Sequence, residues 1–154
     1  MNKNILIVSM VLLTLILAGC DELIVDIMPG TYPNMVNINS KGMVPVAVLG
    51  TETFDVFDLD PTSFVYSDYG ITNVRWHYED VCTLLADGST QKGPDGYIDL
   101  VFQYDMQQIL AAAQANNLVP ADGEVLTITL VGNLKTGESV NGADEIIVTN
   151  KSKK

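Results

Sequence analysis

Short runs in which apolar and polar residues alternate, each closed by turn residues, limit the fold of this chain more than any other feature. In the segment 74–79, for example, Val74, Trp76 and Tyr78 alternate with charged or polar side chains. A period of two over such a length is typical of a strand with one buried face. Together with β-rich runs that end at turn residues, the pattern predicts about seven strands, at residues 23–28, 35–39, 43–49, 74–79, 97–104, 125–131 and 145–149.

One segment departs from this pattern and predicts a helix. Residues 106–117 are rich in Gln, Ala and Leu, lack Gly and Pro, and are followed by the turn residues of 119–123. Short strands with frequent turns predict an all-β fold, which we expect to be an immunoglobulin-like β-sandwich with one inserted helix. A small barrel is the competing architecture. Pro45 argues for an edge strand or a bulge at 43–49. The expected core contains Val46, Trp76, Leu100, Phe102, Leu126, Ile128 and Leu130.

The first twenty residues are built like a secretory signal that ends in a lipidation site. Lys3 is positively charged, Ile5–Leu17 is almost entirely apolar, and small residues precede Cys20, which is the order of a signal peptide. The apolar run is shorter than the roughly 20 residues of a membrane span. Its end, Leu17-Ala18-Gly19-Cys20, resembles the lipobox of bacterial and some archaeal lipoproteins, which are cut before the cysteine.

This resemblance implies a signal peptide over 1–19 and a lipid on Cys20. The protein would then be a lipoprotein on the extracytoplasmic side of the cell envelope, held to the membrane through that lipid. An uncleaved signal anchor is the alternative.

The remaining 135 residues have the size of one ordinary domain. We expect a spacer at 20–22, a single β-sandwich domain at 23–150 and a basic tail at 151–154. These residues include 19 acids and 7 bases. Because so negative a surface repels phosphate backbones, nucleic acid is excluded as a partner, and divalent cations or basic partners fit better.

The start of the predicted domain resembles a β-domain of secreted and surface proteins of bacteria and archaea. That family begins like I-D-I-K-P-G-x-x-P-N-x-I-N-x-x-S-x-G-x-x-P-V-A-I-L-G and later has a segment like H-x-E-D-V-N-G-D-G-x-x-D-L-V. The first pattern is matched at Val25–Gly30, Pro33–Asn34, Val36–Asn37, Ser40–Gly42 and Pro45–Gly50, and the second at His77, Glu79–Val81, Asp95–Gly96 and Asp99–Val101. The resemblance implies a β fold and an extracytoplasmic location, since the family's role is poorly defined.

The acidic residues of the second pattern are candidate metal ligands. The family's loop places carboxylates around a turn that Gly closes easily, and hard oxygen ligands suit Ca²⁺. The resemblance therefore implies calcium binding by Asp80, Asp95 and Asp99, with Glu79 and Asp87 as further ligands. This chain departs from the family by the insertion of residues 82–94. The alternative is a solvated acidic hairpin in which Asp95-Gly96 forms a turn.

Trp76 and Tyr78, on one face of a predicted strand, allow two interpretations. They could form an aromatic platform for sugar rings, but the two-residue period is more typical of core positions. We therefore place Trp76 in the core. Exposure of both rings would favour a binding site.

Catalysis has weaker support in the sequence. Asp55, Asp58 and Asp60 are close in the chain, but this does not supply the two opposed carboxylates of a glycoside hydrolase. Cys82, the second cysteine, is expected to be buried as a small apolar residue. We therefore expect no enzyme but a non-catalytic lipoprotein with a structural or adhesive domain that calcium stabilises. The alternative is a carbohydrate- or small-ligand-binding module, with a surface polysaccharide or a protein as partner.

Overall fold

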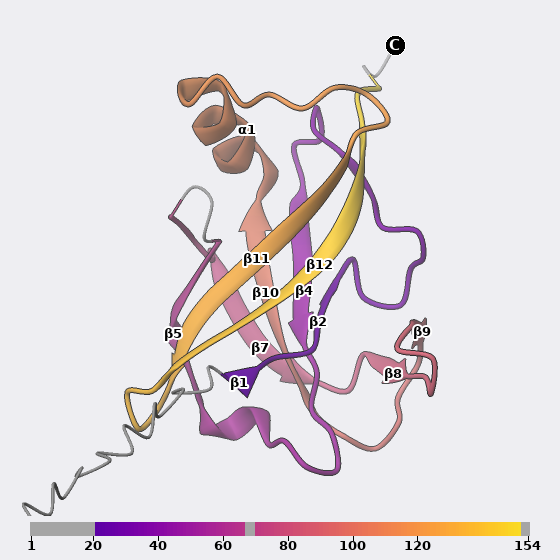
Figure 1. Cartoon of the computed structure of the whole chain (residues 1–154), viewed down its shortest axis with the longest axis vertical. Coiled ribbons are helices and arrows are strands. Elements are labelled where there is room, and N and C mark those ends of the chain that lie inside the picture. Colours follow the sequence, from indigo (N-terminus) through magenta and orange to yellow (C-terminus); the bar gives the residue numbers. More distant parts are fainter. Residues whose placement is uncertain (1–20, 67–69, 152–154) are drawn as a thin grey trace, which may run out of the picture.

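The computed structural model describes residues 21–66 and 70–151. This part of the chain is mainly β, with one α-helix, and its sheets include a curled half-barrel (Figure 1). The elements in chain order are β1 (Asp21–Glu22), β2 (Val25–Ile27), β3 (Met35–Asn37), β4 (Met43–Val48), the 3₁₀-helix η1 (Val56–Asp58), β5 (Leu59–Tyr66), β6 (Ile71–Thr72), β7 (Arg75–Glu79), β8 (Cys82–Leu84), β9 (Thr90–Lys92), β10 (Asp99–Asp105), α1 (Met106–Ala115), β11 (Val125–Leu134) and β12 (Ser139–Thr149).

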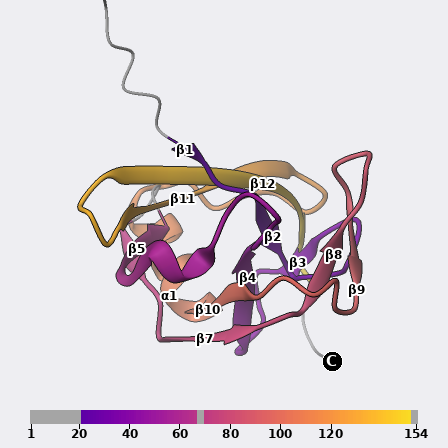
Figure 2. The ribbon, with the colours of Figure 1, turned by 90° about the horizontal axis from the view of Figure 1, so that it is seen from below.

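Two larger sheets face each other, and a separate hairpin projects beside them (Figure 2). The first sheet has the order β1-β12-β11-β5-β6, with β3 also paired to β12. Within it, β1 and β3 run parallel to β12, and the other pairs are antiparallel. The second sheet, β2-β4-β10-β7, is antiparallel throughout. The hairpin consists of β8 and β9.

The main core lies between these sheets and contains a pair of rings in contact, one from each sheet. Phe64 of β5 and Phe102 of β10 are fully buried, with ring centroids 4.9 Å apart. A Cβ at Gly132 would lie 2.6 Å from ring atoms of Phe64. Only glycine therefore fits at this point of β11, where the pairing with β5 shifts register.

All seven predicted strand segments contain a strand. Five further strands in the described part of the chain were not predicted, and β5 is the longest of them; the others are β1, β6, β8 and β9. Asp60 and Pro61 lie inside β5, whose pairing with β11 is irregular between Asp60 and Val65. Ser63 Oγ donates to the Asp60 carbonyl oxygen (2.7 Å) and accepts from the Asn133 N–H (2.8 Å). This side chain thus links β5 to β11 across the irregular stretch, and a strand forms in spite of the proline.

The expectation of an edge strand at Pro45 is wrong. β4 lies between β2 and β10, and Pro45 is paired with Gln103. The Pro45 carbonyl accepts from the Met28 N–H (2.9 Å), just beyond the end of β2. The backbone nitrogen of Pro45, which has no hydrogen to donate, therefore points toward the position where β2 has already ended. No ladder hydrogen bond is lost there, so an interior strand tolerates the proline.

The predicted core is confirmed for five of its residues and wrong for Trp76. Leu126 is half-buried, and Trp76 is 41% exposed. The period of two is right, because Trp76 lies opposite the buried Phe102 in the pairing of β7 with β10. Its exposure arises because β7 is the outer strand of the described sheet. The five confirmed residues are Val46, Leu100, Phe102, Ile128 and Leu130.

Helix α1 is confirmed within two residues of its predicted end. The Asp105 carboxylate accepts from the Gln107 N–H (2.8 Å) and caps the first turn. The helix lies at one end of the space between the sheets (Figure 1). Its buried residues are Met106, Ile109 and Ala113.

The N-terminal boundary of the fold lies earlier than predicted. Asp21 and Glu22, which we assigned to a spacer, pair with Val140 and Asn141 as β1. Residues 1–20, with the predicted signal peptide and Cys20, lie outside the described residues, as do 152–154 of the tail. Within the described ranges, no helix is long and apolar enough to cross a membrane.

Candidate functional site

Three aromatic side chains form a continuous, partly exposed row, here called the aromatic row (Phe57, Tyr78 and Trp76). The ring centroids of Trp76 and Tyr78 are 5.5 Å apart with an edge-on geometry. Those of Tyr78 and Phe57 are 4.4 Å apart. Trp76 is 41% exposed, Phe57 is 46% exposed and Tyr78 is half-buried. A row of this kind offers flat apolar faces beside solvent.

The aromatic row is held in place by the two elements that carry it, the strand β7 and the 3₁₀-helix η1. Tyr78 and Trp76 lie opposite Leu100 and Phe102 in the register of β7 with β10, so the buried neighbours fix their direction. Phe57 belongs to η1, whose first turn is capped by Asp55 through a bond from the Phe57 N–H (2.9 Å). The row is therefore preorganised rather than carried on a loose loop.

Shallow grooves lie at both ends of the aromatic row. Phe57 lines a groove of about 460 Å³ that also contains Glu52, Asp55 and Asp58, with Tyr97 on its opposite segment. Trp76 lines another of about 400 Å³, whose polar groups come from Thr62, Thr72, Asn73 and Arg75. Each groove places hydrogen-bonding groups beside an exposed ring.

The electrostatic setting keeps the Tyr78 hydroxyl protonated. Partial burial, helped by the negative charge of Asp55, raises the pKa of Tyr78 above its ordinary value. The hydroxyl thus remains a hydrogen-bond donor at neutral pH.

The predicted calcium ligands are only partly brought together. Asp80 accepts from the N–H groups of Asp95 (3.0 Å) and Gly96 (2.8 Å), which closes the acidic loop on itself. Asp99 is buried and accepts from the N–H groups of Gly50 (3.1 Å), Val81 (3.0 Å) and Cys82 (3.4 Å). Burial raises the pKa of Asp99 in spite of these bonds.

The two further predicted ligands lie elsewhere. Glu79 pairs with His77 (3.1 Å) on the exposed edge of β7. Asp87 accepts from the Ser89 N–H (3.0 Å) in the turn between β8 and β9. In residues 21–66 and 70–151, no three His, Cys, Asp or Glu side chains form a group that could hold a metal ion. Calcium binding stays a prediction.

Cys82 and two of the acids near Asp58 have structural surroundings. Cys82 is buried, as predicted, and burial together with Asp26 raises the pKa of its thiol well above the ordinary value. Asp55 caps η1, and Asp60 accepts from the Thr62 hydroxyl (2.7 Å). These two carboxylates thus complete local turns.

Phe57 is the functional candidate that sequence reasoning missed. It stands between the acids Asp55 and Asp58, and we considered that segment only for its carboxylates. An aromatic residue two positions after Asp55, a residue type that caps helices, was the available signal. The proximity of Phe57 to β7 could not be predicted from the sequence.

Comparisons with protein-family models, with curated proteins and with solved structures found no match for this chain.

Proposed function

We propose that this protein is a non-catalytic, lipid-anchored domain of the cell envelope that binds carbohydrate through the aromatic row. The observation that carries the proposal is the exposure of Trp76 and Phe57 in one row with Tyr78. Trp76 and Phe57 lie at the two ends of this row with the half-buried Tyr78 between them, and a continuous exposed apolar patch often marks a binding site. Trp76 meets the exposure criterion for the binding module and the half-buried Tyr78 meets it only in part, so the support for that module comes from Trp76 together with Phe57.

Carbohydrate is the ligand class that matches both parts of the site. The apolar faces of sugar rings pack on exposed aromatic faces, and their hydroxyls need donors and acceptors nearby. The groove beside Phe57 supplies the carboxylates of Glu52 and Asp58, and the groove beside Trp76 supplies the amide of Asn73. A purely apolar ligand would leave these groups without partners.

The anchor would hold this site close to the membrane. Cys20 directly precedes β1, so a lipid on Cys20 would leave no flexible linker before the sheet. The loop before η1 and β1 lie at the same end of the domain (Figure 1). We therefore propose a polysaccharide near the membrane surface as the ligand. Adhesion through such a polymer is compatible with the same site.

The finer fold assignment and the metal belong to this proposal as well. The resemblance of Val25–Gly30 and Pro45–Gly50 to the secreted β-domain supports an immunoglobulin-like sandwich. Calcium as a stabilising ion of the acidic loop rests on the resemblance of Asp80, Asp95 and Asp99 to the family's acidic pattern.

The test is a binding assay of the full chain in detergent against peptidoglycan, chitin, cellulose and starch. Trp76→Ala and Phe57→Ala should each weaken retention on the bound polymer about tenfold or more, as expected for central aromatic anchors. Tyr32→Ala is the matched control, because Tyr32 is 86% exposed and lies outside the row. Equal retention of all variants, or no retention of the unaltered protein on any polymer, would contradict the proposal.

A further inference from the structure

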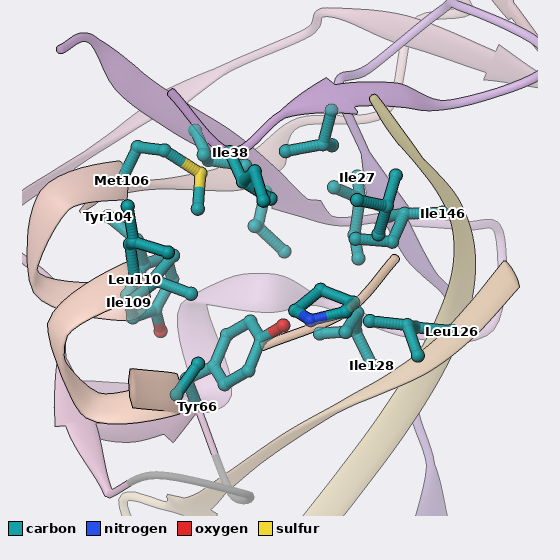
Figure 3. Close-up of a pocket in the computed structure, with 16 residues that line it drawn as sticks. Ile27, Ile38, Tyr66, Tyr104, Met106, Ile109, Leu110, Leu126, Ile128 and Ile146 are labelled. Atoms are coloured by element: carbon teal, nitrogen blue, oxygen red, sulfur yellow. The ribbon is translucent and has the colours of Figure 1, made fainter. Parts of the chain in front are cut away.

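A second possible site lies inside the fold, independent of the aromatic row. Beneath α1 the two sheets enclose a cavity of about 40 Å³. Figure 3 shows Met106, Ile109 and Leu110 on one side of it, and Ile27, Leu126 and Ile146 on the other. Apart from two tyrosines, the side chains that line it are apolar.

One polar group in this lining has no use within the described fold. Tyr104 is fully buried, and its hydroxyl has no hydrogen-bond partner among the described residues. Its ring is fixed by Phe102 and Tyr66, with centroids 6.2 Å from each. Buried hydroxyls nearly always have a partner, because an unpaired one forfeits the hydrogen bonds it makes in water. The unpaired Tyr104 hydroxyl therefore indicates that the cavity holds a hydrogen-bond partner for it.

A water molecule would have few partners in this cavity. A cavity above roughly 10–15 Å³ can hold one water molecule, and an ordered water makes two to four hydrogen bonds. The lining side chains supply two polar groups, the hydroxyls of Tyr66 and Tyr104, which is the lower limit for a water. A molecule with an apolar body and one oxygen acceptor matches the lining better, since it contacts the aliphatic side chains and accepts from a single donor.

We propose that the cavity under α1 binds a small apolar molecule with one oxygen acceptor, to which the Tyr104 hydroxyl donates. Entry would pass the connection from α1 to β11. Residues 116–124 there are exposed except for the half-buried Pro120, which lines the cavity. Burial raises the pKa of Tyr104 and so keeps its hydroxyl protonated as a donor.

The test uses a pair of isosteric probes on the full chain in detergent of constant concentration. Acetone and isobutene share a heavy-atom skeleton, but acetone has an oxygen where isobutene has a CH₂ group. Binding is read from the ¹³C-methyl resonances of Ile27, Ile109 and Ile128. We expect Tyr104→Phe to weaken acetone binding about five- to tenfold, the loss of one hydrogen bond, and to leave isobutene binding unchanged.

Ala113→Leu provides the second arm. Ala113 is buried in α1 and lines the cavity, so the larger side chain should fill it and abolish binding of both probes. Lining methyl groups that respond to neither probe in the unaltered protein would overturn the proposal. So would equal weakening of both probes by Tyr104→Phe, or a long-lived water detected at the Tyr104 ring.

Discussion

Replacing Asp99 by Asn should destabilise the fold strongly, because this buried carboxylate holds three segments together. One oxygen accepts from the Gly50 N–H (3.1 Å), and the other accepts from the N–H groups of Val81 (3.0 Å) and Cys82 (3.4 Å). An asparagine has one oxygen, so its NH₂ group must face either one or two of these donors. Each buried N–H left without an acceptor costs about 1–3 kcal/mol.

The removal of a charge partly offsets this loss. Burial raises the pKa of Asp99, so ionising it costs the folded state some stability. We therefore expect a net loss of about 2–4 kcal/mol at neutral pH, at the upper end of single-residue effects. The assay is urea unfolding of the full chain, in which the midpoint should fall with little change in the slope.

Asp87→Asn is the matched control, since Asp87 is exposed and bonds only locally to Ser89. It should change stability by less than about 0.5 kcal/mol. Equal stability of the Asp99 and Asp87 variants would refute the reasoning. The same curves in calcium and in a chelator test the metal hypothesis separately. Stabilisation by calcium that Asp80→Asn removes would support it, and identical curves would contradict it.

Three further outcomes are expected. Ile128→Ala should cost about 2–5 kcal/mol in urea unfolding, because Ile128 is 5% exposed in the core, and a loss below about 0.5 kcal/mol would contradict that placement. Burial raises the pKa of both Asp99 and Asp144 in the folded state, so their contribution to stability is full below the unfolded pKa of about 3.9 and is lost as pH rises through the folded values. The melting temperature should thus rise on mild acidification, and Asp144→Asn should flatten that rise. Cys20→Ala should remove a lipid mass and detergent partitioning, and unchanged partitioning would reject the lipoprotein assignment.

Local patterns in the sequence determined the element types. The alternation in β7, β10 and β11 follows from the backbone itself, since successive side chains of a strand point to opposite faces. The helix at 106–115 is equally local, because its residues favour a helix and Asp105 caps it. Such features need no knowledge of distant segments, and each of them could be predicted.

Only the tertiary structure decided which faces are covered. Trp76 has the period of a core residue, yet it is exposed because its strand lies at the margin of a sheet. Pro45 lies in an interior strand because β2 ends beside it. Phe57 joins Tyr78 across 21 positions of sequence, and Asp99 serves backbone groups from two other segments. These outcomes depend on which distant segments pair with each other, because that pairing determines which side chains are exposed to solvent. The local period of apolar residues carries no information about distant segments.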